Sequence, residues 1–165
     1  MTSEEKIIET CQKLGISLDE LGVMVVDHGS RRAASNAALL EVVKLFEETT
    51  PYRLVEPAHM ELAEPSIEQA YTSLVGRGAK FVAVHPYFLS PGRHWAEDIP
   101  ALAAEAAKSH PGVGHIVTSP LGIHALMAQV MHHRIAHCLD HHAGRGPSCD
   151  ICDEVGRCSL EGTAN

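Results

Sequence analysis

The amino-acid sequence predicts an α/β fold, a flavodoxin-like three-layer sandwich around a four-stranded parallel sheet. Short apolar runs of strand length alternate with segments of helical periodicity. The connections between them are short, which favours parallel pairing through right-handed crossovers. The first run, Leu21 to Val26, contains no polar residue, as expected for a strand buried on both faces. The simplest strand order is 2-1-3-4.

The first expected element is a short N-terminal helix at residues 3–14. Thr2 and Glu5 have the spacing of a capping box, and Gly15 ends the apolar periodicity. Proline favours the first turn of a helix, so Pro65 and Pro100 are expected to open two of the later helices. The expected strands are 21–26, 52–60, 80–88 and 113–118. The other expected helices are 33–49, 65–76, one that starts at residue 100, and 121–141, with 89–97 as a loop.

Composition limits the organisation of the chain and its class. Residues 1–143 are expected to form the α/β domain, and 144–165 a C-terminal cysteine tail, because the chain becomes polar and rich in glycine and proline from Gly144. The 165 residues suffice for a core without disulfide bonds. No apolar run reaches about 18 residues, so no membrane-spanning helix is expected.

Charge and the N-terminal residues narrow the setting further. Thirteen basic against 21 acidic side chains give a net charge of −8, which argues against a nucleic-acid partner. The N-terminal segment is acidic and lacks an apolar core, so neither a signal peptide nor a transit peptide is expected. These features predict a cytoplasmic protein with no membrane partner.

Two loops are expected to meet at one edge of the sheet. Ligands of open parallel sheets bind beyond the carboxyl ends of the strands, where the strand order reverses. In the predicted order this place lies between the first and third strands, whose exit loops are 27–31 (DHGSR) and 85–100 (HPYFLSPGRHWAEDIP). Each loop supplies one histidine, His28 or His94, beside a glycine, Gly29 or Gly92. The glycines fit either close approach of a ligand or an ordinary turn.

The residue types at this edge suit metal chemistry. Imidazole binds first-row divalent metals, and its neutral form can also accept a proton. Arg31, Arg32 and Arg93 border the two loops, either as partners for carboxylates or as ordinary surface arginines. His59 and His85 lie in or near strands, where structural hydrogen bonding is the simpler expectation.

The two loops and HMELAEPSI, residues 59–67, resemble the short sirohydrochlorin chelatases, class II tetrapyrrole chelatases that insert a divalent metal without ATP. The resemblance runs from about residue 21 to residue 158. It implies that His28 and His94 handle the metal and are catalytic, together with Glu61. Glu64 is the alternative acidic residue, and Glu61 could also be a solvent-facing strand end. Substrate contacts would come from Gly29, Ser30, Arg31, Ser90, Pro91, Gly92 and Arg93. A single domain of this class implies a homodimer.

The cysteines near the C-terminus form a second candidate site. Cys138, Cys149, Cys152 and Cys158 have the pattern C-x10-C-x2-C-x5-C, which indicates four-thiolate binding of a metal. Spacing does not separate structural zinc from an iron–sulfur cluster. The segment resembles the tail of plant-type sirohydrochlorin ferrochelatases, which implies a [2Fe–2S] cluster and iron as the inserted metal. Cys11 is expected to be a half-buried small side chain.

The combined expectation is an enzyme, a lyase that inserts Fe²⁺ into sirohydrochlorin to give sirohaem. The nearest alternative is a cobaltochelatase that inserts Co²⁺ in cobalamin synthesis. A non-catalytic metal-delivery protein or an iron–sulfur protein is the alternative from another class. The histidines at 133, 137 and 141 share one helix face, either as a solvated surface or as an accessory metal path.

Overall fold

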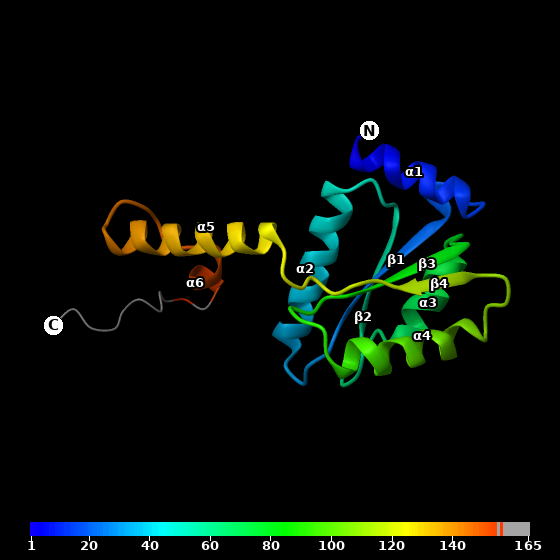
Figure 1. Cartoon of the computed structure of the whole chain (residues 1–165). Coiled ribbons are helices and arrows are strands. Elements are labelled where there is room, and N and C mark those ends of the chain that lie inside the picture. The colour runs from blue at the N-terminus through cyan, green and yellow to red at the C-terminus, as the bar shows by residue number, and fades with distance from the viewer. Residues whose placement is uncertain (155, 157–165) are drawn as a thin grey trace. The chain divides into compact units, whose positions relative to one another are not determined.

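A computed structural model describes residues 1–154 and 156 of the chain. Its centre is a four-stranded parallel sheet in the order β2-β1-β3-β4, shown in Figure 1. The strands are β1 (Leu21–Asp27), β2 (Leu54–His59), β3 (Phe81–Pro86) and β4 (Gly114–Val117). The α/β class and the strand order predicted from sequence are both confirmed.

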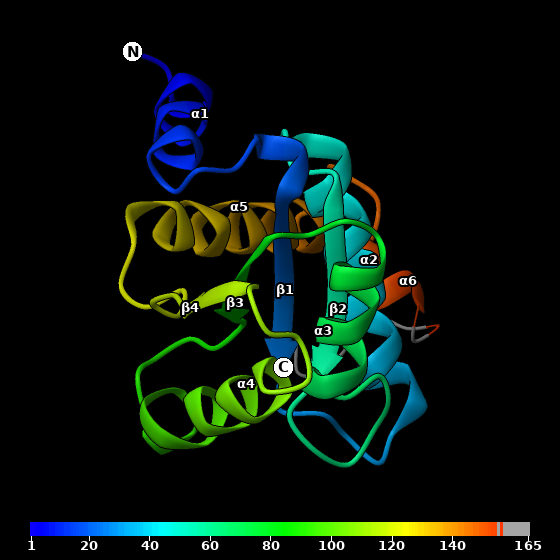
Figure 2. The ribbon, with the colours of Figure 1, turned by 90° about the vertical axis from the view of Figure 1, so that its right-hand side faces the viewer.

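Helices cover both faces of the sheet. Helix α2 (Ala33–Thr49) lies on one face, and α3 (Ile67–Gly76) and α4 (Ile99–Ala107) lie on the other (Figure 2). Side chains of β1 alternate between the two layers. Val23 and Val25 pack in the core on the α2 side, and Met24 and Val26 pack in the core on the side of α3 and α4. This explains why the first strand is apolar throughout.

Helix α1 (Ser3–Lys13) begins with the predicted capping box, in which Thr2 and Glu5 bond each other's backbone N–H. At α3, Ser66 is the N-cap and Pro65 precedes it, so the helix starts two residues later than expected. The segment predicted as loop 89–97 is partly helical. A π-helical turn, His94–Asp98, leads directly into α4.

The chain divides into two compact units, Met1–Gly122 and Ile123–Asn165. The second contains α5 (Ala125–His142) and the short helix α6 (Asp150–Glu154), which sequence analysis did not predict. None of the residues of α5 is buried. Helix α5 thus belongs to the same unit as the cysteine tail. The domain boundary expected after residue 143 stays a prediction.

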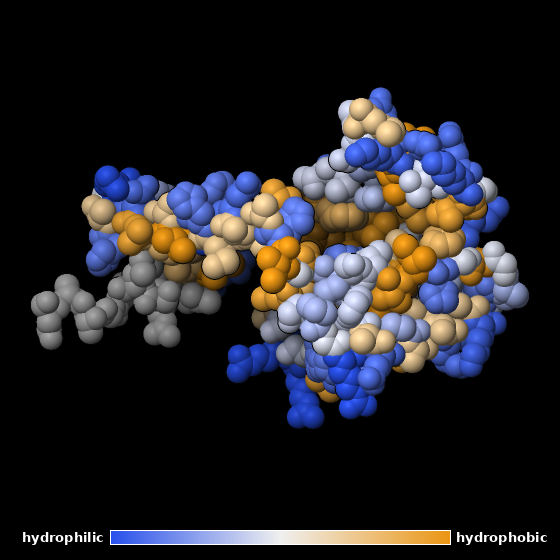
Figure 3. Space-filling view, viewed as in Figure 1, coloured by the Kyte–Doolittle hydropathy of each residue, from blue (hydrophilic) through white to orange (hydrophobic). Residues whose placement is uncertain are grey.

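The first unit carries an apolar hollow of about 410 Å³ on the α2 side of the sheet. Its walls come from α1, α2 and the strands, and part of it shows as recessed orange surface in Figure 3. Cys11 of α1 lies in this wall and is fully buried, further than the half-buried position expected of it, and burial raises the pKa of its thiol. Within the described residues, no helix combines the length and apolarity needed to cross a membrane.

Candidate functional site

One carboxylate ties the loop after β1 to the end of β2. Asp27 Oδ1 accepts hydrogen bonds from the Gly29 backbone N–H at 2.9 Å and from Nδ1 of His59 at 2.6 Å. The His59 side chain is only 1% exposed. Because an ionised carboxylate can only accept, Nδ1 of His59 carries the proton. This buried contact fixes the start of the loop that carries His28.

The backbones of the segments that follow β1 and β2 stay hydrogen-bonded to each other beyond the ends of the strands. The Met60 N–H donates to the Asp27 carbonyl at 2.9 Å, and the Glu61 N–H to the His28 carbonyl at 3.1 Å. Gly29 then turns the chain away with φ +85°, and a Cβ at this position would lie 1.9 Å from the Glu61 carbonyl oxygen. Only glycine allows so close an approach, so the loop requires Gly29 for a structural reason.

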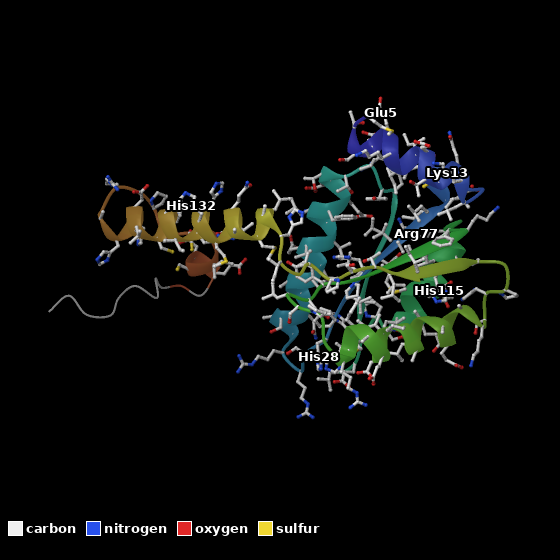
Figure 4. All side chains as sticks on the ribbon, viewed as in Figure 1. Glu5, Lys13, His28, Arg77, His115 and His132 are labelled. Atoms are coloured by element: carbon white, nitrogen blue, oxygen red, sulfur yellow. The ribbon has the colours of Figure 1, made fainter. Side chains whose placement is uncertain are left out.

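This pairing brings Glu61 to His28, which Figure 4 labels near the carboxyl end of β1. Nε2 of His28 lies 2.9 Å from Oε1 of Glu61, and both side chains are about half exposed. The other ring nitrogen, Nδ1, lies 3.0 Å from the Gly29 carbonyl oxygen. Of the two glutamates considered from sequence, Glu61 is the one that the structure joins to His28.

The two contacts of His28 occupy both of its ring nitrogens. The Gly29 carbonyl can only accept, so a hydrogen bond at this contact takes its hydrogen from Nδ1. A metal ion that binds Nε2 of His28 must displace the Glu61 carboxylate from it.

His94 comes from the π-helical turn after β3. Its ring centroid lies 5.1 Å from that of His28, with the ring planes at 69°. Nδ1 of His94 is 2.7 Å from Oδ2 of Asp98, and the Phe88 ring lies on another side at 6.5 Å. Trp95 anchors the turn to the end of β4 by donating from Nε1 to the Thr118 carbonyl at 2.9 Å.

The structure thus brings together the three side chains that the resemblance implies for catalysis. They do not yet form a complete coordination shell. In the described part of the chain, no three histidine, cysteine or acidic side chains are arranged to hold a metal ion together. An ion shared by His28 and His94 would therefore need further ligands from water, from a bound substrate, or from Glu61 after it leaves His28.

The residues expected to contact a substrate lie around this group. Ser30 is fixed by Asn36 of α2, which accepts from the Ser30 N–H at 2.9 Å and donates to its carbonyl at 2.8 Å. Arg31 is exposed, and Arg93 is exposed but pairs with Glu97 at 3.3 Å. The residues Ser90, Pro91 and Gly92 are exposed between β3 and the π-helical turn.

Sequence reasoning missed Asp27, Asn36 and Asp98. Their partners lie in other loops or one turn further along, and nothing in residue type alone marks them. Asp98 did carry one signal, since it stands four residues after His94. His59 and His85 have the structural hydrogen bonds expected of them, His85 through Thr118 at 2.8 Å.

In the second unit, Cys138 and Cys149 lie near Arg134. Arg134 of α5 pairs with Asp150 of α6, which raises the pKa of the Arg134 guanidinium and lowers the pKa of the Asp150 carboxyl. Negative charge on Cys149 and Cys138 adds to the rise in the pKa of Arg134, so both thiols lie close to it. Cys152 is buried, and Cys158 lies outside the described residues.

Thiols are a suitable ligand type for a metal centre. Cys149 and Cys152 stand three residues apart around the start of α6, and Cys138 lies on α5. The described cysteines do not by themselves form a three-ligand group that could hold a metal ion. Cys149 also lines a hollow of about 370 Å³ within this unit, together with His133, His137 and Arg134.

The fold is a parallel α/β sheet, and the first site places His28 and His94 side by side at its switch point. The chain belongs to the CbiX family, and the sequence model of that family matches residues 22–138. It is 52% identical over 142 residues to the chloroplastic sirohydrochlorin ferrochelatase of Arabidopsis thaliana. It is also 39% identical over 80 residues to a sirohydrochlorin cobaltochelatase of Methanococcus maripaludis.

A solved structure supports the same relationship. SirB from Bacillus subtilis, determined with Fe³⁺, matches 70% of this chain with a TM-score of 0.66 and 27% sequence identity. The chain covers less than two thirds of the length of these relatives. The alignments span 86% of this chain and 63% of the Arabidopsis protein, and 48% of this chain and 56% of the Methanococcus protein. For SirB the matched share is 46% of its chain.

Proposed function

We propose that the protein is a sirohydrochlorin ferrochelatase, which inserts Fe²⁺ into sirohydrochlorin without ATP and releases sirohaem. The observation that carries this proposal is the meeting of His28, His94 and Glu61 at the switch-point edge of the sheet. The 52% identity to the Arabidopsis ferrochelatase supports iron as the metal and sirohydrochlorin as the substrate.

The two imidazoles present the incoming ion. With Nδ1 of each ring bonded to an acceptor, Nε2 is the nitrogen left to bind the metal. At His28 the ion competes with Glu61 for Nε2, and binding frees the carboxylate. The incomplete set of protein ligands suits an ion that is passed on, because the remaining coordination positions can be filled by the nitrogens of the macrocycle.

Glu61 then has a second task. Insertion requires the inner pyrrole N–H groups of the macrocycle to lose their protons. The carboxylate released from His28 lies half exposed beside the ring site and can accept a proton and pass it to solvent. When the ion leaves Nε2, His28 can accept the second proton, and Glu61 can return to its contact with the ring.

The exposed arginines supply charge for the substrate. Sirohydrochlorin is a polycarboxylate, whereas this chain has a net charge of −8. Arg31 and Arg93 lie in the two loops that carry the histidines, where guanidinium groups can bind carboxylates in a bidentate geometry. Glu97 must release Arg93 for that role.

The test mixes anaerobic protein with sirohydrochlorin and Fe²⁺ and follows insertion by the visible spectrum of the macrocycle. His28→Ala and His94→Ala are expected to lower the insertion rate by about a hundredfold, the scale of a lost positioned acid–base group. His132→Ala, on exposed surface of α5, is the matched control and should retain the wild-type rate. Wild-type rates in both site variants would refute the role of the two histidines. No insertion by the wild-type protein would refute the proposed activity and favour a non-catalytic metal-delivery protein.

The same assay decides between iron and cobalt. The Methanococcus relative is named for cobalt, so insertion of Co²⁺ is the second candidate activity. Parallel reactions with Fe²⁺, Co²⁺ and Ni²⁺ at equal concentration should give the fastest insertion with Fe²⁺. A faster reaction with Co²⁺ would assign the protein as a cobaltochelatase instead.

We infer further that Cys138, Cys149, Cys152 and Cys158 bind a [2Fe–2S] cluster. Arg134 beside two of these thiols supports a centre with negatively charged ligands, and structural zinc remains the alternative. Thiolate ligands of a metal centre fit a reducing compartment, which supports a cytoplasmic location as part of this proposal. When bound, the cluster would supply one-electron redox chemistry.

Metal analysis of anaerobically purified protein tests the cluster. We expect iron and acid-labile sulfide with visible cluster absorbance, and both should be lost in Cys149→Ser. Cys11→Ala, which removes a buried thiol of the first unit, should keep them. Stoichiometric zinc without sulfide would contradict the cluster and assign a structural zinc site.

We also propose that the working enzyme is a homodimer. The chain matches 46% of SirB, so two copies would supply about the same amount of chelatase fold as one SirB chain. Two-fold pairing is the commonest arrangement of identical subunits. Light scattering of the wild-type protein should give twice the mass of the chain, and a monomer with full insertion activity would refute the pairing.

A further inference from the structure

We propose that Asp98 is a positioning residue for His94, and that its carboxylate holds the imidazole in the tautomer whose Nε2 binds the metal. This inference rests on the proposed metal-handling role of His94. It adds a fourth side chain to the site, one that does not itself touch the metal.

The hydrogen bond between the two side chains fixes the tautomer. Nδ1 of His94 lies 2.7 Å from Oδ2 of Asp98, and an ionised carboxylate can only accept. The hydrogen is therefore on Nδ1. In the neutral ring Nε2 then has no hydrogen, and its lone pair is available to a metal ion.

The local backbone makes this contact possible. His94 and Asp98 are the first and last residues of the single π-helical turn, which the Ile99 N–H closes by bonding the His94 carbonyl. The turn leads without a break into α4, so the carboxylate stands on helical backbone at the junction of the two. Isolated π-helical turns are rare and frequently occur at functional sites.

Neighbouring charges leave Asp98 to His94. Arg93, in the same turn, pairs with Glu97 at 3.3 Å. The Asp98 side chain is 36% exposed and that of His94 47% exposed, so water screens the bond partly without replacing it. The contact is thus an ordered carboxylate–histidine pair of moderate strength.

The two acidic residues of the site have different positions. Glu61 contacts His28 on Nε2, the side where a metal would bind, and must leave when the ion arrives. Asp98 contacts His94 on Nδ1, behind the ring, and can stay throughout the reaction. His28 has only the neutral Gly29 carbonyl at the corresponding place. A charged hydrogen-bond partner makes an imidazole a better metal ligand, so we expect His94 to bind the metal ion more strongly than His28.

Metal binding by the protein alone gives the first measurement. Co²⁺ titration, followed by its visible absorption, should show an affinity about 10- to 100-fold lower for Asp98→Ala, the usual effect of losing such a partner. Asp98→Asn should lie between wild type and Asp98→Ala, because the amide oxygen still accepts a hydrogen bond but carries no charge. This variant also preserves the volume of the side chain, in case Asp98→Ala fails to fold.

The tautomer gives a second measurement that a merely structural role would not change. In ¹⁵N-histidine-labelled, metal-free protein above neutral pH, the wild-type His94 ring should show the Nδ1–H tautomer. Asp98→Ala should shift the ring towards Nε2–H, the form that free imidazole side chains prefer in water. Glu105→Gln removes an exposed carboxylate of α4 that pairs with Lys108 and serves as the matched control.

Parallel measurements on His94→Ala separate this inference from the proposed function. If His94→Ala weakens Co²⁺ binding while Asp98→Ala matches wild type in affinity and tautomer, the positioning role is refuted and the metal role stands. If His94→Ala binds Co²⁺ like wild type, the metal role fails and this inference fails with it. Loss of affinity in both variants, with the tautomer shift in Asp98→Ala, is the expected result.

Discussion

At the scale of single residues, the site depends on a few contacts of short range. Gly29 lies against the Glu61 carbonyl, Asp27 accepts from both Gly29 and buried His59, and Asp98 lies behind His94. Each of these contacts holds a segment that carries a proposed metal ligand against a neighbouring part of the fold. Small changes at these positions should therefore affect metal binding out of proportion to their size.

Gly29→Ala is the sharpest test of this packing. The new Cβ would overlap the Glu61 carbonyl, and φ +85° is unfavourable for alanine. We expect a loss of about 1–3 kcal/mol in the free energy of unfolding, together with loss of metal capture.

Urea denaturation and Co²⁺ titration measure the two effects. Gly76→Ala is the control, because a Cβ at this helical position meets no atom within 4 Å. It should leave stability unchanged or raise it by up to about 1 kcal/mol. A Gly29→Ala protein as stable as wild type would show that the two loops do not need their close approach.

The residue types at the site were partly visible in the sequence. His28 and His94 each follow a predicted strand, and strand order alone places them at the same edge. Asp98 and Asn36 could not be assigned in this way, because acidic and amide side chains are common on helix surfaces. Their roles depend on which neighbour the backbone brings within hydrogen-bonding distance.

At the scale of elements, capping and periodicity set the boundaries. The capping box formed by Thr2 and Glu5 starts α1 at Ser3, the residue expected from the sequence. The prediction that Pro65 opens α3 is wrong. Ser66 and Gln69 form the capping box, and Pro65 stands outside the helix. The π-helical turn was missed, since a segment that contains Pro91 and Gly92 reads as a loop by composition.

The capping of α3 gives a prediction at this scale. Ser66→Ala removes the hydroxyl that accepts from the Gln69 N–H and should lower the free energy of unfolding by about 1 kcal/mol. Ser66→Asp should retain most of the stability, because aspartate also caps helix N-termini. Thermal or urea unfolding measures both variants. Equal losses in the two would show that the side-chain cap contributes nothing.

At the scale of the whole molecule, burial inside the first unit couples stability to pH. His85 of β3 is partly buried beside Thr118, and desolvation lowers its pKa below the ordinary value of 6.5. Below about pH 6.5 the unfolded chain therefore binds a proton that the folded chain does not. The contribution of His85 makes the protein less stable as the pH falls through this range.

Urea unfolding at pH 8 and pH 5 measures this effect. His85→Gln keeps a hydrogen-bonding group but cannot titrate, so the difference in stability between the two pH values should shrink. His132→Gln, a change at an exposed histidine of α5, should leave the difference as in the wild type. An unchanged difference in His85→Gln would show that His85 binds protons equally in both states.

The α/β class, the strand order and the histidines at the sheet edge could be predicted from residue order alone, because periodicity and loop placement are local properties. The spacing of the cysteines likewise indicated the C-terminal tail. The folded chain was needed to show that Glu61 meets His28, that Asp98 lies behind His94, and that α5 groups with the tail. Those outcomes depend on distances between segments far apart in the chain or on the exact turn of the backbone, which residue order does not specify.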